Sequence, residues 1–261
     1  MRRAASRVDY DAAYAKRPKG DLIEALDRES LSDCRGIAGY AAYVTSQDLS
    51  RCRASVRALD LGLQLPVIDL GCGLGELTRW LASHSGRAAV GIDTSAVAVR
   101  EAVARSKRNT HFLRGDAQRI PMRGDSAAAV VSLDALYLVA RPREALRELR
   151  RVLATGGLLI FTAYISHEST KGGGCVGAQF WPAELAENGF ELRSSFDMTG
   201  AWREYMLNKH SRRWSQRERI LARRGESAVA ELAVSAAMIG AAGRPRFLDN
   251  VERREFTASA G

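Results

Sequence analysis

One stretch, residues 67–82 with the sequence VIDLGCGLGELTRWLA, constrains the fold more than any other part of the chain. A short apolar run ends in a carboxylate, three glycines follow at alternate positions, and apolar residues then recur at helical spacing. Because glycine has no Cβ, Gly71, Gly73 and Gly75 allow a sharp turn and the close approach of a ligand to the backbone. The pattern predicts a strand, a tight turn and a helix, and the free N–H groups at the start of that helix favour a nucleotide-like ligand.

Strands and helices alternate after this stretch. The sequence predicts strands over 88–92, 111–114, 128–133, 158–164, 190–197 and 246–256, and helices over 95–107, 143–153 and 182–188. Such alternation is typical of a parallel sheet covered by helices on both faces. We therefore expect an α/β fold with a Rossmann-like, seven-stranded, mostly parallel sheet. An N-terminal helical arm and a helical cap inserted before the last strand complete the expected architecture.

The arm and the cap carry patterns of their own. Tyr10 and Tyr14 are four residues apart in the polar N-terminal segment, so they share one face if that segment is helical. Thr45 with Asp48 three residues later resembles a capping box that opens a helix over about 46–59. In the insertion, 201–242, helical spacing predicts one apolar stripe made of Leu207, His210, Trp214 and Leu221.

The charge of the chain is basic, with a formal net charge of +9. A basic protein can bind nucleic acid, but the arginines alternate with acidic and apolar residues on predicted helices and form no long basic block. Solvated helix faces account for that pattern. The four cysteines are far apart and show no metal-ligand spacing, so we expect free thiols and no metal site. No signal peptide or membrane-spanning run is evident, and we expect a cytoplasmic protein without a membrane partner.

Four motifs, in this order and at this spacing, resemble those of the class I S-adenosylmethionine-dependent methyltransferases. They are Asp69 with 71–75 (GCGLG), 91–93 (GID), 115–117 (GDA) and 132–137 (SLDALY), the last followed by RVLxxGG over 151–157. The resemblance covers about residues 40–164. The glycine spacing G-x-G-x-G also departs from the dinucleotide fingerprint G-x-G-x-x-G, which makes NAD a poor alternative.

The resemblance implies a binding role for each motif. Asp69 and the backbone of Gly71 and Gly73 would hold the methionine end of S-adenosylmethionine, Asp93 the ribose, and Asp116 with Ala117 the adenine. Leu133 would lie near the sulfonium, and the remaining expected cofactor residues are Cys72, Gly75 and Thr94. Two structural alternatives stay open, since Asp93 could instead cap the next helix and Asp116 could make a turn.

Methyl transfer from a sulfonium is an in-line displacement, so much of the catalysis comes from positioning the acceptor. A base is needed where the acceptor arrives protonated, as an amine does. The candidates for catalytic groups are Tyr137, Asp134, Tyr14, Tyr10 and His167. Each has an alternative: Tyr137 could belong to the core, Asp134 could cap the following segment, and the two arm tyrosines could only pack the arm. His210 is read as a packed residue of the cap.

The expected parts are an N-terminal arm or lid (1–60), a cofactor-binding core (61–200), a helical cap (201–243), and the last strand with the tail (244–261). A cap implies a small-molecule acceptor, and we expect an N-methyltransferase of natural-product biosynthesis that leaves S-adenosylhomocysteine as product. O-methylation is the near alternative. An RNA methyltransferase and a cofactor-binding member that no longer transfers methyl groups are more distant ones. The sequence leaves the oligomeric state open, a homo-oligomer included.

Overall fold

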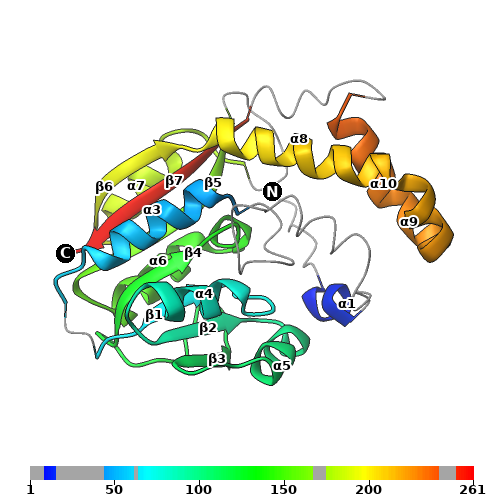
Figure 1. The fold of residues 1–261 in the computed structure, drawn as a ribbon. Coiled ribbons are helices and arrows are strands. Elements are labelled where there is room, and N and C mark those ends of the chain that lie inside the picture. Colours follow the sequence, from blue (N-terminus) through cyan, green and yellow to red (C-terminus); the bar gives the residue numbers. More distant parts are fainter. Residues whose placement is uncertain (1–8, 16–43, 62–63, 167–174, 241–250) are drawn as a thin grey trace.

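The computed structural model describes residues 9–15, 44–61, 64–166, 175–240 and 251–261, and its centre is one seven-stranded sheet (Figure 1). The strands lie in the order β3-β2-β1-β4-β5-β7-β6. They are β1 (Val67–Leu70), β2 (Ala89–Asp93), β3 (Thr110–Arg114), β4 (Ala127–Ser132), β5 (Leu153–Ser166), β6 (Phe190–Asp197) and β7 (Val251–Ala260). Neighbouring strands from β3 to β5 pair in parallel, and β7 pairs antiparallel with both β5 and β6. The expected fold class is confirmed.

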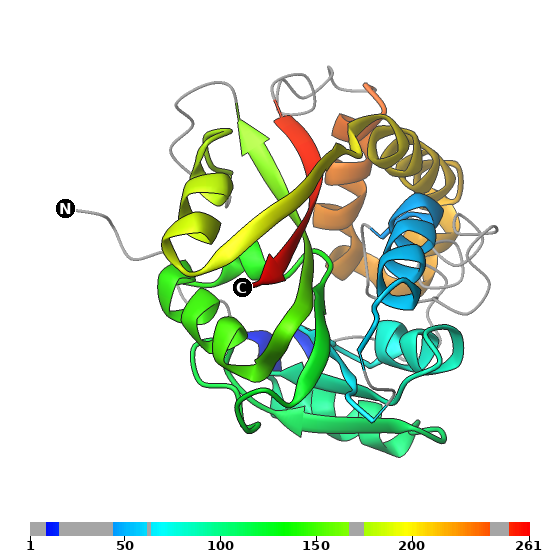
Figure 2. The same ribbon diagram turned by 90° about the vertical axis from the view of Figure 1, so that its left-hand side faces the viewer.

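Helices cover both faces of this sheet. Figure 2 shows α6 (Pro142–Val152) and α7 (Phe180–Glu187) on one side, with α3 (Ser46–Arg57) and α4 (Glu76–His84) on the other. Two further helices, α5 (Ala96–Ala104) and α1 (Tyr10–Ala15), lie next to each other to the right of β2 and β3 in Figure 1, and α5 packs against both of these strands.

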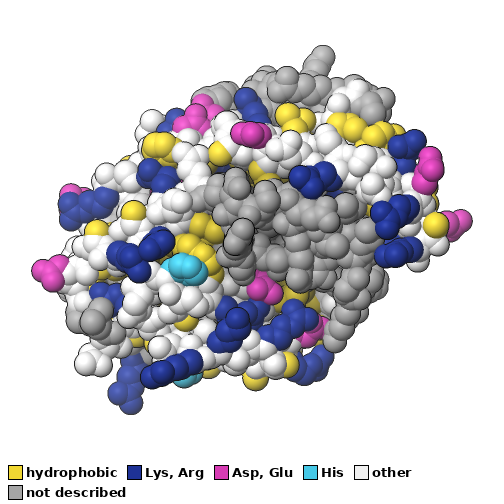
Figure 3. Space-filling model, in the orientation of Figure 1, with side chains coloured by type: hydrophobic (Ala, Val, Ile, Leu, Met, Phe, Trp, Pro, Cys, Tyr) yellow, Lys and Arg dark blue, Asp and Glu magenta, His cyan; other side chains and the backbone are white. Residues whose placement is uncertain are grey.

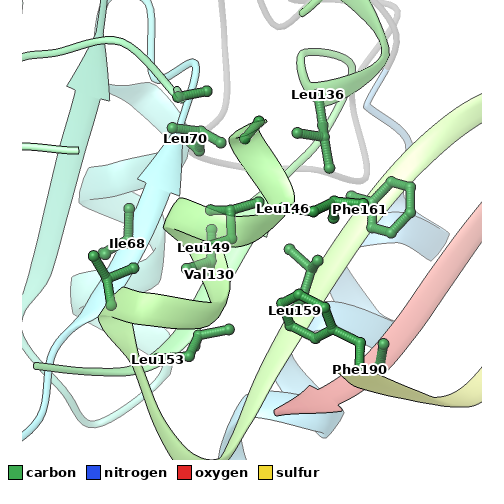
Figure 4. Packing of buried hydrophobic residues seen from close by; sticks show 14 of the residues in the cluster. Ile68, Leu70, Val130, Leu136, Leu146, Leu149, Leu153, Leu159, Phe161 and Phe190 are labelled. Atoms are coloured by element: carbon green, nitrogen blue, oxygen red, sulfur yellow. The ribbon is translucent and has the colours of Figure 1, made fainter. Parts of the chain in front are cut away.

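The buried strands are apolar on both faces because both are covered. Ile68 and Leu70 of β1 belong to the core under α6 and α7, whereas Val67 belongs to the core under α3 and α4. Figure 4 shows how Leu146 and Leu149 of α6 meet side chains from several strands of the first core. Asp69 points to the same side as Val67, which brings it against α4.

The predicted capping box is present at the start of α3. The side chain of Thr45 accepts a hydrogen bond from Asp48 N–H, and Asp48 Oδ2 accepts one from Thr45 N–H at 2.6 Å. Both residues are buried. This cap starts the helix in front of the β5–β7 side of the sheet, where Asp48 later meets a partner from β7.

A helical insertion precedes β7, as expected, and its described residues form three α-helices rather than a single long one and a second: α8 (Thr199–Ser215), α9 (Arg217–Arg224) and α10 (Val229–Met238). The predicted stripe is wrong in part, because Leu207 and Leu221 are exposed. The helix breaks at Gln216, so a single helical period does not run across the two halves. The buried face of α8 carries Trp202, Tyr205, Met206, Lys209 and His210, and the first three of these pack on the sheet core.

Two strand boundaries differ from expectation. The segment with Gly156 and Gly157 lies inside β5, where a register shift in the pairing with β4 accommodates it. The last strand is described from Val251 to Ala260 and ends four residues later than predicted, whereas residues 246–250 of the prediction lie outside the described residues. Among the described residues, no helix has both the length and the apolar character needed to cross a membrane.

Candidate cofactor and active site

The C-terminal ends of β1, β2 and β4 meet at one edge of the sheet, and the glycine turn lies there. Asp69 is in register with Gly91 of β2 and with Val131 of β4. The N–H groups of Gly71 and Cys72 both donate to the carbonyl of Ile92, at 2.8 and 3.1 Å, which holds the turn against β2. An edge of this kind, where the strand order reverses, is the ligand-binding edge of open α/β sheets.

The glycine turn has a backbone that only glycine adopts easily. Gly71, Gly73 and Gly75 have φ of 80°, 50° and 78°. A Cβ on Gly71 would collide with the Cβ of Ala135, and one on Gly73 would lie 2.6 Å from the hydroxyl oxygen of Tyr14. The backbone of the turn therefore faces the segment that follows β4 on one side and the arm helix α1 on the other. Cys72, between the glycines, is buried.

Asp69 lies under the turn rather than over it. Its carboxylate accepts a hydrogen bond from Thr78 Oγ1 at 2.6 Å, and the residue is only 2% exposed. Burial raises the pKa of Asp69 to about 7. The contact braces the turn against α4. The direct contact of Asp69 with the methionine end stays a prediction.

Asp93 joins the two loops that follow β1 and β2. Its Oδ2 accepts a hydrogen bond from Gly73 N–H and its Oδ1 one from Ser95 N–H, each at 2.9 Å. The cap of α5 is Ser95, whose hydroxyl accepts from Ala98 N–H, so the alternative of Asp93 as the helix cap is wrong. A carboxylate oxygen has two lone pairs, and Asp93 retains acceptor capacity for ribose hydroxyls. Burial raises its pKa.

The third motif follows β3 at the same edge. Gly115 N–H donates to the carbonyl of Asp93 at 3.0 Å, so Asp116, the next residue, begins beside the loop that contains Asp93. Asp116 Oδ1 accepts from the backbone N–H of Gln118 at 2.8 Å, so the turn-forming reading of Asp116 holds for this oxygen. Ala117 is buried beside it. Thr94 is exposed, and its carbonyl accepts from Arg114 Nε at 3.1 Å.

The segment after β4 is held in an unusual conformation. Leu133 is buried, and Asp134 has a φ of 58°, which is a left-handed backbone that non-glycine residues rarely adopt. Asp134 N–H donates to Thr162 Oγ1 at 2.8 Å. The hydroxyl of Tyr164 donates to Asp134 Oδ1 at 3.3 Å, and the ring of Tyr137 packs edge-on against Tyr164 at 5.0 Å between centroids.

A buried ion pair that the sequence did not predict fixes this segment. Arg253 of β7 is fully buried and lies 2.7 Å from Asp48 Oδ1 and 3.2 Å from Asp134 Oδ2. One guanidinium thus faces two carboxylates. Burial raises the pKa of Asp134, and the nearby Arg253 opposes that rise. An arginine within a predicted strand was the only signal in the sequence, since Asp48 and Arg253 are 205 residues apart.

The arm helix α1 lies over the glycine turn, and it carries both predicted tyrosines. Tyr14 reaches Gly73, and Tyr10, at the start of the same helix, is half-buried. His167 lies outside the described residues. Within the described parts of the chain, no group of His, Cys, Asp and Glu side chains could hold a metal ion.

These features fit the expected cofactor in two respects. The glycine turn approaches Ala135 and the Tyr14 hydroxyl more closely than any residue with a Cβ could, and Asp93 presents a carboxylate beside this turn. The N–H groups at the start of α4 add a positive end for a carboxylate of the ligand.

Comparisons with known proteins agree with this geometry. A family model described as a methyltransferase domain matches residues 68–161. An uncharacterised 37.1 kDa protein in transposon TN4556 of Streptomyces fradiae is 29% identical over 284 residues, which covers 97% of this chain and 75% of that protein. Malonyl-[acyl-carrier protein] O-methyltransferase of Marinomonas sp. (strain MWYL1) is 31% identical over 147 residues. That match covers 55% of this chain, and it spans about half of the enzyme's length, 52%.

The fold has solved counterparts as well. Phosphoethanolamine N-methyltransferase 2 of Haemonchus contortus, in complex with S-adenosyl-L-methionine, superposes with a TM-score of 0.71 at 18% sequence identity. The superposition covers 94% of this chain and 61% of that one. Motif order, strand order and these matches agree: residues 68–161 form a methyltransferase domain, and the chain has the fold of the class I S-adenosylmethionine-dependent methyltransferases.

Proposed function

We propose that the protein transfers the methyl group of S-adenosylmethionine to the nitrogen of a small-molecule amine of natural-product biosynthesis. The observation that carries the choice of nitrogen is the carboxylate of Asp134. It follows Leu133, the residue expected near the sulfonium, and it accepts a hydrogen bond from the hydroxyl of Tyr164. A nitrogen gains positive charge when it is methylated, and a nearby carboxylate stabilises that charge. The same carboxylate would repel an anionic oxygen acceptor.

The bound cofactor supplies an electrophilic methyl group, and the chain's own residues orient the partners. Gly71, Gly73 and Tyr14 would hold the methionine end, and Asp93 the ribose. Tyr137 and Tyr164 would form one wall of the acceptor site, so that the nitrogen lies in line with the methyl group. Orientation of this kind is worth an effective molarity on the order of 10⁵ M or more.

We further propose a division of labour along the chain. Residues 1–60 would act as an arm over the cofactor, 61–200 with 244–261 as the binding core, and 201–243 as a cap over the acceptor. Trp202 and Tyr205 support such a cap, since they lie at the base of α8 and pack on the sheet core beside Tyr164. The buried Cys52 and Cys72, both free thiols, support a reducing compartment such as the cytoplasm.

The proposal is tested by product analysis with S-adenosylmethionine that carries a deuterated methyl group. Amines, phenols and carboxylic acids of matched size would be incubated with the protein, and products would be located by mass spectrometry. We expect labelled methyl on nitrogen. Labelled phenols or esters alone would establish an O-methyltransferase, a result that the names of the relatives also accommodate, since they include both kinds.

One surface feature keeps the RNA alternative worth a control. Basic side chains gather near β3 and α5, along the lower edge of the view in Figure 3. Arg100, Arg105, Lys107, Arg108 and Arg114 are exposed there. Binding of RNA whose affinity falls steeply with salt would favour that alternative. Cofactor binding without turnover on any acceptor would favour a member that does not transfer methyl groups.

A further inference from the structure

The arm helix α1 touches two loops of the cofactor site at once, through two side chains on the same face. Asp11 and Tyr14 are three residues apart on α1. Tyr14 reaches Gly73 in the loop after β1. Asp11 Oδ1 accepts hydrogen bonds from Ser95 Oγ at 2.6 Å and from Val97 N–H at 3.1 Å, and both of these donors lie at the start of α5 after β2.

The two loops are themselves joined by Asp93. One oxygen of this carboxylate accepts from Gly73 N–H and the other from Ser95 N–H. The contacts therefore form a closed ring that runs from Asp11 to Ser95, Asp93, Gly73 and Tyr14 and back along α1. Two members of this ring, Asp93 and Gly73, are residues expected to hold the ribose and the methionine end of the cofactor.

Asp11 is well placed to hold the ring shut. Its carboxylate meets N–H groups at the positive end of α5, where negative charge is favourable. The hydrogen bond from Ser95 lowers the pKa of Asp11, so the residue is ionised at neutral pH. A second contact of α1 with the core is the approach of the Tyr14 hydroxyl to Gly73, which a bound ligand would also touch.

We propose that Asp11 is a positioning residue for the cofactor: by binding Ser95 and Val97 it holds α1 over the site and slows the release of S-adenosylmethionine and S-adenosylhomocysteine. The proposal rests on the cofactor assignment and does not depend on the acceptor. Because the ring must open before a ligand leaves, a weaker Asp11 contact raises the dissociation rate more than it lowers the association rate.

The test measures release of tritiated S-adenosylhomocysteine during a chase with excess unlabelled compound. Asp11→Ala removes two charge-assisted hydrogen bonds, and we expect release to accelerate about tenfold to a hundredfold. Asp11→Asn keeps an oxygen that accepts hydrogen bonds but loses the charge, and it should fall between Asp11→Ala and the wild type. Asp60→Ala, which changes an exposed acid on the far side of the glycine turn's strand, is the matched control and should release the compound at the wild-type rate.

A double-mutant cycle distinguishes the proposed role of Asp11, which is to hold α1 over the site, from a role in supporting α5 alone. Ser95→Ala removes both the Asp11 contact and the cap of α5, so on its own it also lowers helix stability. If Asp11 acts through Ser95, adding Ser95→Ala to Asp11→Ala should accelerate release by less than the product of the two single effects.

A second readout follows α1 directly. Trypsin cleavage after Lys16, the residue that follows α1, should be slowed by saturating S-adenosylhomocysteine in the wild type and much less in Asp11→Ala. Equal release rates and equal protection from trypsin in Asp11→Ala and wild type would overturn the proposed role of Asp11 while leaving the cofactor assignment intact. A wild-type protein that binds no S-adenosylhomocysteine would overturn both. An Asp11→Ala protein with a lower melting temperature but an unchanged release rate would make Asp11 a support of α5 only, and the proposal would fail.

Discussion

Replacing Arg253 by methionine should destabilise the protein more than any substitution of a surface arginine. Methionine has a similar length and no charge, so the variant leaves Asp48 and Asp134 buried without their common partner. Removing one member of a buried ion pair costs about 3–5 kcal/mol of unfolding free energy. With an m-value of about 3 kcal/mol per molar urea, the midpoint of unfolding should fall by about 1 to 2 M.

The neighbouring residue provides a matched control. Arg254 lies on the same strand but points to the other side, where it binds Glu252 at 2.8 Å and remains about one-third exposed. Exposed ion pairs contribute about 0.2–1 kcal/mol. Arg254→Met should therefore shift the urea midpoint by about 0.3 M or less. Equal midpoints for the two variants would refute the claim that the Arg253 pairs stabilise the fold.

The pH dependence gives a second check on the same reasoning. Burial already raises the pKa of Asp134, and loss of Arg253 removes the positive charge that opposes this rise. In Arg253→Met the folded state should therefore bind a proton that the unfolded state has released, and its stability should fall as the pH rises. The loss of unfolding free energy in Arg253→Met relative to wild type, measured by urea unfolding, should be smaller at pH 5 than at pH 8. A deficit that does not change with pH would contradict this mechanism.

Three further predictions concern the cofactor edge. Burial raises the pKa of Asp69 from 3.8 to about 7. The wild-type protein therefore loses unfolding free energy as the pH rises from 4 to 7, because the buried carboxyl group must give up its proton. Asp69→Asn has no such group, so its unfolding free energy relative to wild type should increase by up to about 4 kcal/mol between pH 4 and pH 8. Urea unfolding at both pH values measures this, and a constant difference would speak against a buried, titrating Asp69. Asp93→Ala should weaken binding of S-adenosylmethionine by about tenfold or more, since it removes charge-assisted hydrogen bonds to the ribose; unchanged affinity in calorimetry would refute the ribose site. Tyr137→Phe should lower turnover more than cofactor affinity if its hydroxyl meets the acceptor, whereas parallel changes in both would leave it a packing residue.

The sheet and its cofactor edge were predictable because their signals are local. A glycine turn with positive φ, a capping box at Thr45 and Asp48, and apolar runs that end in acids each need only a few consecutive residues. The order of the motifs along the chain then fixes which strand ends share an edge. The order of the strands in the sheet was not predicted, because local patterns do not specify which strands pair.

The contacts that shape the β4 exit were not predictable, because they join distant parts of the chain. Asp134 read equally well as a catalytic group and as a cap, and only the fold brings Arg253 to it from 119 residues away. The cap stripe failed for a different reason: the helical period was extended through Gln216, where the helix ends. Trp202 and Tyr205, which pack inward from α8, did not belong to the predicted stripe.

The position of β7 has a consequence for how the chain is made. Residues 251–260 form an inner strand that pairs with β5 on one side and β6 on the other. During synthesis both of these strands have an open edge until that segment leaves the ribosome, and open edges invite pairing with other chains. The partly synthesised protein therefore remains prone to aggregation until β7 is made, which is longer than the parallel strands β1 to β5 would need by themselves. A chain that ends before Val251 should collect in inclusion bodies, even though it contains all the cofactor motifs.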